Sequence, residues 1–78
     1  MQVVVRGIEV EGNGRVNVGV RIGGWDYDFS YANEAQLRGT LSEDEPPPQS
    51  LAAVQAVVVL YGQNTIDGSV SLPQTVEI

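Results

Sequence analysis

The feature that most constrains this chain is a valine-rich run, residues 15–22, that lies between two short glycine loops. Residues 12–14 (GNG) precede the run and residues 23–24 (GG) follow it, and both loops hold residue types that tolerate the positive φ angles of tight hairpins. Each loop length fixes one register, because a shift of one residue would turn every side chain to the opposite face of the sheet. The two hairpins, derived separately, place the same four side chains on one face: Val16, Val18, Val20 and Ile22. Their agreement predicts an antiparallel meander with strands at 3–11, 15–22 and 25–32.

The third strand contains WDYDFSY, residues 25–31, which holds four of the five aromatic side chains of the chain. In the predicted register the aromatic positions face the same way as the valines, while Asp26 and Asp28 between them face solvent. Aromatic side chains opposite β-branched ones stabilise antiparallel strands, by about 0.2–1 kcal/mol for each pair. A platform for stacking nucleic-acid bases would need basic residues around it, and acids flank this one. We therefore expect four side chains to belong mainly to the core: Trp25, Tyr27, Phe29 and Tyr31.

The register of the first hairpin leaves three side chains in unfavourable positions. Arg6 falls on the inward face, opposite Val20. Either its stem runs over the sheet so that its head reaches water at the edge, or a bulge near Gly7 turns it outward; a buried ion pair and a partner contact also stay open. Val3 and Val5 fall on the outer face of an edge strand, where apolar side chains need a cover.

On the same outer face, Gly7, Gly19 and Asp28 are expected side by side. Two adjacent glycines would leave a shallow strip of bare backbone. Either another chain approaches this strip closely, or the face is simply solvated and the glycines have no binding role.

Residues 50–62 (SLAAVQAVVVLYG) predict a helix over about 49–62 that ends at Gly62. One side of this helix is apolar and carries Leu51, Val54, Val58 and Tyr61. The opposite side has one polar residue among four: Ala52, Gln55, Ala56 and Val59. Because this side is too apolar to face water in a monomer, we expect a cover from either the C-terminal segment or a second copy of the chain.

The remaining segments have no sustained period. Leu37 and Leu41 are expected to anchor residues 33–50 on the core, with a short helical turn near residues 34–38. The run SEDEPPP, residues 42–48, leads into the helix or forms a stiff acidic docking loop, since proline restricts the chain before binding. In the tail, Pro73 favours an edge position for a short last strand, next to either the first or the third strand.

Acidic residues outnumber basic ones by ten to four, and the net charge is -6. Nucleic-acid binding depends on basic side chains that displace counterions from phosphates, so direct contact with nucleic acid is not expected. A basic protein partner suits this charge better, although solubility and adaptation to a salty cytoplasm also favour acids. No apolar run approaches the roughly 20 residues of a membrane span, and the start lacks the pattern of a secretion signal. We therefore expect a cytoplasmic protein without membrane contact.

Catalytic chemistry has few residues to draw on. The chain has no histidine, cysteine or lysine, which removes the common nucleophiles, bases and thiolate ligands. A pair of carboxylates can hydrolyse a glycoside, but a chain of 78 residues has few residues from which to form a catalytic cleft. The acids lack the spacing of an EF-hand, and the glycines form no phosphate-binding or dinucleotide-binding fingerprint. We expect no enzyme activity, no cofactor and no metal site.

Together these patterns predict an α+β fold in a single domain over residues 1–78: the three-stranded antiparallel meander packed on one helix, with a short C-terminal strand. The functional hypothesis is a small, acidic, non-enzymatic protein-binding module that engages a basic surface of a nucleic-acid-handling protein, such as an inhibitor used by a phage or mobile element against host defence (anti-CRISPR-like). The alternative is a structural subunit of a virion or another homo-oligomeric particle, for which a homodimer is the simplest form; a ligand-binding or catalytic domain is a third and weaker candidate. The partner-binding residues of the first hypothesis are Asp26, Asp28, Glu43, Asp44 and Glu45.

Overall fold

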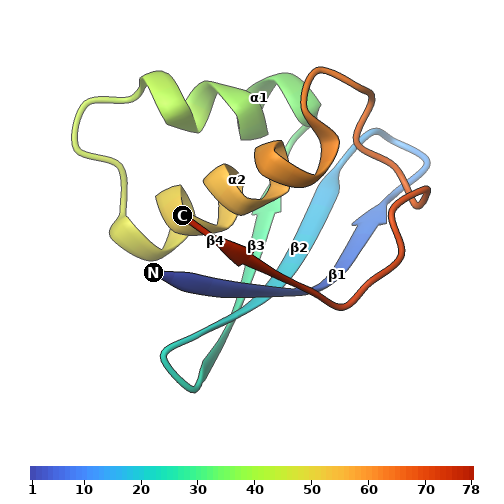
Figure 1. Cartoon of the computed structure of the whole chain (residues 1–78). Helices are drawn as coiled ribbons and strands as arrows, with labels where there is room; N and C mark the ends of the chain where they lie inside the picture. Colours follow the sequence, from blue (N-terminus) through green and yellow to red (C-terminus); the bar gives the residue numbers. More distant parts are fainter.

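A four-stranded antiparallel sheet with the strand order β3-β2-β1-β4 forms one layer of the computed structural model, and the helices lie together on one of its faces (Figure 1). The structure describes all of residues 1–78. In chain order the elements are β1 (Gln2–Val10), β2 (Val16–Ile22), β3 (Trp25–Tyr31), α1 (Glu34–Gly39), the 3-10 helix η1 (Thr40–Ser42), α2 (Pro48–Tyr61) and β4 (Gln74–Glu77). The α+β class is therefore confirmed, with two α-helices in place of the one expected.

The hairpin of β2 and β3 has the register that the sequence predicts. Every pair agrees, from Val16 opposite Tyr31 to Ile22 opposite Trp25. Three inward-facing valines of β2 are at most 2% exposed: Val16, Val18 and Val20. The central place of β2 in the meander, on which the sequence interpretation depends, is confirmed.

β1 follows the predicted register only from its end back to Gly7. A β-bulge between Val5 and Gly7 shifts the remaining pairs by one residue, so that Val5 lies opposite Val20. The expectation that Val3 and Val5 lie on the outer face is wrong, because both are fully buried. The extra residue of a bulge has no partner on the neighbouring strand and interrupts the alternation of side chains between the two faces of the sheet. Arg6 is that residue, and it points to the outer face and is exposed, as the bulge alternative predicts.

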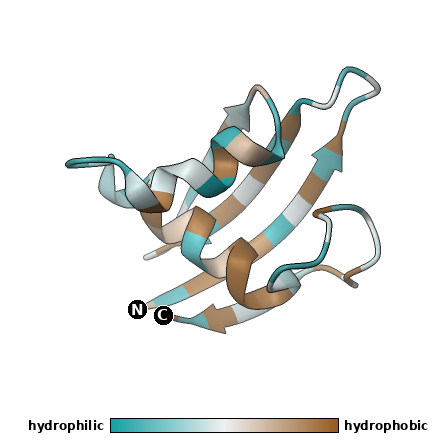
Figure 2. Ribbon diagram, turned by 90° about the horizontal axis from the view of Figure 1, so that it is seen from above, coloured by the Kyte–Doolittle hydropathy of each residue, from teal (hydrophilic) through white to brown (hydrophobic).

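β4 is an edge strand that pairs antiparallel with the first half of β1. This confirms the edge position and decides between the two neighbours that the sequence left open. Val76 of β4 is buried and extends the core. The two ends of the chain lie side by side, and the Ile78 amide donates to the Met1 carbonyl at 2.9 Å (Figures 1 and 2).

The core between the sheet and the helices is built mainly from valine and alanine. Seen from above, α2 crosses the sheet with apolar residues along much of its length (Figure 2). It packs on β1, β2 and β4, while α1 and η1 pack beside it. The buried apolar side chains are Val3, Val5, Val16, Val18, Val20, Tyr31, Leu37, Ala52, Ala53, Val54, Ala56, Val57, Tyr61, Ile66 and Val76.

The apolar back of α2 is partly covered within the same chain. Ala52 and Ala56 are at most 3% exposed, whereas Val59 remains 62% exposed. β4 of the C-terminal segment packs against α2, and so do α1 and η1. A second copy of the chain is therefore not required to bury the two alanines.

The segment before α2 is held by one leucine and one arginine. The Asn33 side chain caps α1, which begins where the helical turn was predicted. Leu37 is fully buried, but Leu41 is 44% exposed, so the expectation that both leucines are anchors is wrong for Leu41. Arg38 donates to the Gly62 carbonyl at 2.7 Å, which ties α1 to the end of α2.

Candidate protein-binding surfaces

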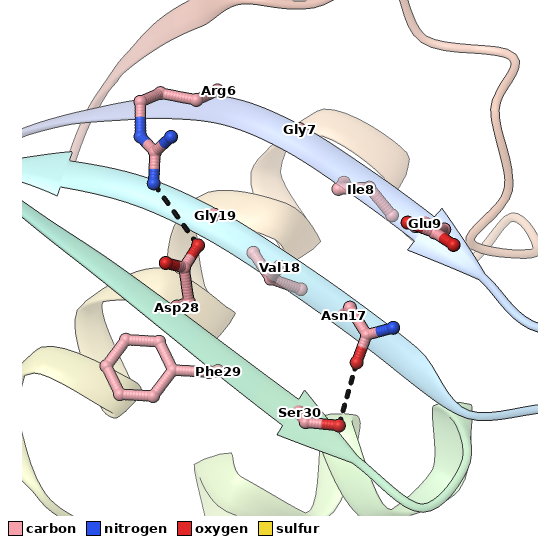
Figure 3. Close-up of a pocket in the computed structure, with 10 residues that line it drawn as sticks. All are labelled: Arg6, Gly7, Ile8, Glu9, Asn17, Val18, Gly19, Asp28, Phe29 and Ser30. Carbon is pink, nitrogen blue, oxygen red and sulfur yellow. Dashed lines mark hydrogen bonds and ion pairs between the residues drawn. The ribbon is translucent and has the colours of Figure 1, made fainter.

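The face of the sheet opposite the helices carries a shallow groove of about 560 Å³ (Figure 3). Its floor is bare backbone where Gly7 of β1 lies opposite Gly19 of β2, and Asp28 of β3 continues the row. This row is the one that the sequence predicts. Polar side chains from all three strands surround the floor: Arg6, Glu9, Asn17, Asp28 and Ser30.

Arg6 connects β1 to both acids of β3 across the width of β2. Its Nε lies 3.3 Å from Oδ1 of Asp26, and its Nη2 lies 3.3 Å from Oδ1 of Asp28. Arg21 adds a third ion pair, with Nη1 at 3.5 Å from the same Asp26 oxygen. The guanidinium of Arg6 passes over Gly19, where an added Cβ would lie 3.1 Å from Arg6 Nη2 and 3.1 Å from Asp28 Oδ1. Glycine at position 19 therefore makes room for this contact.

A chain of hydrogen bonds orders the other end of the outer face. Nη1 of Arg15 donates to Oγ of Ser30 at 2.9 Å, and Ser30 donates to Oδ1 of Asn17 at 2.8 Å. Nδ2 of Asn17 in turn donates to Oε2 of Glu11 at 2.8 Å. Each side chain is thus oriented by the next one. The charges on this face nearly balance, with three arginines against four acids: Arg6, Arg15, Arg21, Glu9, Glu11, Asp26 and Asp28.

Two tyrosines and one aspartate outside the groove have shifted pKa values. Burial raises the pKa of Tyr31 above 10.0, its 2.9 Å hydrogen bond with Ser50 opposes this rise, and the charge of Glu43 adds to it. Burial also raises the pKa of Tyr61, and hydrogen bonds from a nearby serine lower the pKa of Asp67. No three acidic side chains gather closely enough to hold a metal ion. The groove itself is lined by paired charges and oriented hydrogen-bonding groups.

Glu43, Asp44 and Glu45 form an exposed acidic loop between η1 and α2 (yellow-green in Figure 1). None of the three carboxylates forms an ion pair within the chain. The backbone of Glu45 has a φ of +53°, a value that residues other than glycine rarely adopt, and three prolines follow it. The three charges of the acidic loop stand in consecutive positions and equal half of the net charge of -6.

The residues predicted to bind a partner divide between two surfaces. Asp26 and Asp28 lie on the outer face of the sheet in contact with arginine. The acidic loop lies with the helices on the other side (Figure 1). The sequence interpretation missed the role of Arg6 in this division, although its unfavourable inward placement was the signal that could have revealed it.

The inward side of β3 forms a third surface, because the helices cover it incompletely. Trp25 is 71% exposed, so the expectation that it belongs to the core is wrong. α2 lies over the other three strands, and the hairpin of β2 and β3 extends away from the helices (Figure 1). Tyr27 and Phe29 are half-buried and stack, with ring centroids 6.2 Å apart and planes at 5°. We call Trp25, Tyr27 and Phe29 the aromatic strip.

No protein-family model, curated protein or solved structure matches this chain. Neither α1 nor α2 has the length and apolar character of a helix that crosses a membrane. The three surfaces described above are therefore the basis for a functional assignment.

Proposed function

We propose that this protein is a small, non-enzymatic binding module that engages a basic surface of a protein partner through its acidic loop. The proposal is supported by the difference between the acids that are paired with arginine and the acids that are not. Asp26 and Asp28 are in contact with arginine, whereas Glu43, Asp44 and Glu45 have no cation beside them. Adjacent carboxylates without internal partners attract a basic surface and speed its association.

The proline residues that follow the acidic loop support the same function. Pro46, Pro47 and Pro48 restrict the backbone, and Pro48 already lies in the first turn of α2. A loop that is stiff before binding loses less conformational entropy when it docks. The loop therefore presents its charges at a low entropic cost.

A protein that handles nucleic acids is the partner class that we infer. Such proteins carry clefts of lysine and arginine that bind phosphates, and an acidic protein surface competes for the same groups. A module that occupies such a cleft acts as an inhibitor and needs no catalytic residue. An inhibitor carried by a phage or mobile element against host defence, as anti-CRISPR proteins are, is the biological role that fits these properties.

The test measures how much the acidic loop contributes to association. The partner is captured from a lysate of the native host on the immobilised protein, identified by mass spectrometry and purified. Association rates are then compared by surface plasmon resonance at low and high salt. The loop variant carries Glu43→Gln, Asp44→Asn and Glu45→Gln, and a control variant of equal net charge carries Glu9→Gln, Glu11→Gln and Glu77→Gln.

We expect the loop variant to associate about tenfold or more slowly at low salt, because electrostatic steering acts on the association rate. The control variant should slow association far less, since it changes the total charge by the same amount without changing the loop. Equal effects of the two variants would show that the loop has no special role. An association rate that does not change with salt would contradict the proposal as a whole.

The assembly-subunit alternative is supported by exposed apolar side chains. Trp25 is 71% exposed and Val59 is 62% exposed, and burial of both against further copies would stabilise a homo-oligomer. Sedimentation at increasing protein concentration tests this alternative. A protein that stays monomeric throughout would remove it.

A further inference from the structure

The sheet ends in two free edges that differ in how well they could accept another strand. β4 (Gln74–Glu77) has four residues and follows Pro73, and a short edge next to proline is poorly suited to further pairing. β3 (Trp25–Tyr31) has seven residues, contains no proline or bulge, and is the outermost strand on its side. β3 is therefore the edge that can take up an additional strand.

The register of the β2–β3 hairpin fixes which backbone groups of β3 point outward. Ile22 and Trp25 flank the two-residue turn and pair with each other. In an antiparallel hairpin such a closing pair exchanges hydrogen bonds, and hydrogen-bonded pairs then alternate along the ladder. The N–H and C=O groups of Asp26, Asp28 and Ser30 consequently point away from β2. Because β3 has no neighbour on that side, these groups have no strand partner.

The two faces of this edge differ in chemistry. On the outer face, the side chains of Asp26 and Asp28 are 52% and 86% exposed, with the Arg6 guanidinium on the side toward β2. A residue of an added strand would lie about 5 Å from the acid opposite it, on the side away from Arg6. On the inner face, the aromatic strip is only partly covered by this chain. An added strand would thus meet carboxylates at alternate positions and aromatic rings between them.

We propose that the free edge of β3 binds an extended segment of the partner in which basic and apolar residues alternate. This inference rests on the proposed function and adds the form of the partner segment to it. Lysine or arginine side chains lie opposite Asp26 and Asp28, apolar side chains cover the aromatic strip, and backbone hydrogen bonds join the segment to the sheet. A second copy of β3 fits poorly, because the antiparallel register centred on the strand places Asp28 directly opposite its own copy.

The experiment uses the full chain and a short synthetic peptide that alternates lysine and valine. Hydrogen exchange is followed for each backbone amide by NMR, with and without the peptide. We expect slower exchange at Asp26, Asp28 and Ser30, together with a change in Trp25 fluorescence. Replacing both acids, Asp26→Asn with Asp28→Asn, should weaken binding by about two- to thirtyfold, the range for two exposed ion pairs.

Two further peptides separate strand pairing from simple charge attraction. For a segment that runs antiparallel to β3, N-methylation of the lysines removes the N–H groups that face β3, whereas N-methylation of the valines removes those that point away. Only the first modification should abolish protection. A peptide with glutamate in place of lysine should bind more weakly than the lysine peptide.

Several results would overturn the inference. These are protection at the acidic loop instead of β3, equal effects of the two methylation patterns, or β3 protection that rises with protein concentration without any peptide. If one of these results occurs while the loop variant still slows association with the natural partner, the proposed function stands and the β3 inference fails. If β3 binds the peptide as expected while the loop variant associates normally, the edge inference stands and the role of the loop fails.

Discussion

Replacing Leu37 by alanine should destabilise this protein more than any other change in the segment before α2. Leu37 is fully buried and is the one buried side chain of α1. Truncation of a buried leucine costs about 2–5 kcal/mol, which is a large part of the roughly 4–12 kcal/mol expected for a domain of this size. At about 4–8 °C for each kcal/mol, the melting temperature should fall by at least about 8 °C.

Leu41→Ala provides a matched control, because it is the same substitution four residues later at a position that is 44% exposed. It should cost about 0.5 kcal/mol or less, the range for surface substitutions away from special features. Thermal and urea unfolding, followed by circular dichroism, compare the two variants. Equal losses would show that α1 is not anchored as the structure describes, and a negligible loss for Leu37→Ala would mean that α1 is not part of the cooperative unit.

Two further predictions concern the outer face and the tyrosines. Gly19→Ala should be less stable than Gly7→Ala by about 0.5–1 kcal/mol, since a Cβ at position 19 meets Arg6 and Asp28 at 3.1 Å whereas one at position 7 meets nothing within 4 Å. Urea unfolding measures this difference, which should shrink when Arg6→Ala is added; a difference that persists unchanged would have another cause. Burial raises the pKa of Tyr31 above 10.0 in the folded state, so this group contributes stability that is complete below pH 10.0 and is lost as the pH rises through the raised value. Melting temperatures measured from about pH 9 upward should show this loss, and Tyr31→Phe should reduce the slope; a slope unchanged by that variant would refute the assignment.

The hairpins were predictable from sequence because the information that sets them is local. Loop length and residue alternation fix each register over short stretches of chain, and a hairpin with the wrong register would expose its valines. The bulge in β1 was harder to predict because residues 3–5 are all valine, so either face of this stretch can be buried. The position of Arg6 decides which face of this stretch is buried. The bulge buries two valines instead of one and also moves the guanidinium from the core side to the acids of β3.

Which side chains are covered was less predictable than which way they point. The register gave the direction of Trp25 correctly, but exposure depends on where α2 crosses the sheet, and α2 packs on β1, β2 and β4. The sequence of α2 does not determine this placement, because the helix is apolar around most of its circumference. For the same reason the sequence left open what covers the back of α2, although Leu37 marked the segment before α2 as anchored.

The charge of the chain shows most clearly why a site is harder to predict than a fold. Counting acids along the sequence treats Asp26 and Asp28 as equivalent to Glu43, Asp44 and Glu45, because a count contains no cross-strand distances. The fold makes them different: Arg6 reaches the first two only because β1 bulges and Gly19 has no side chain in its path. The acidic loop therefore keeps three consecutive carboxylates without an ion pair, while Asp26 and Asp28 gain a second property, their place beside backbone groups that have no strand partner. The loop variant and the edge variant therefore remove different carboxylates, and a double-mutant cycle measures whether their effects on binding add.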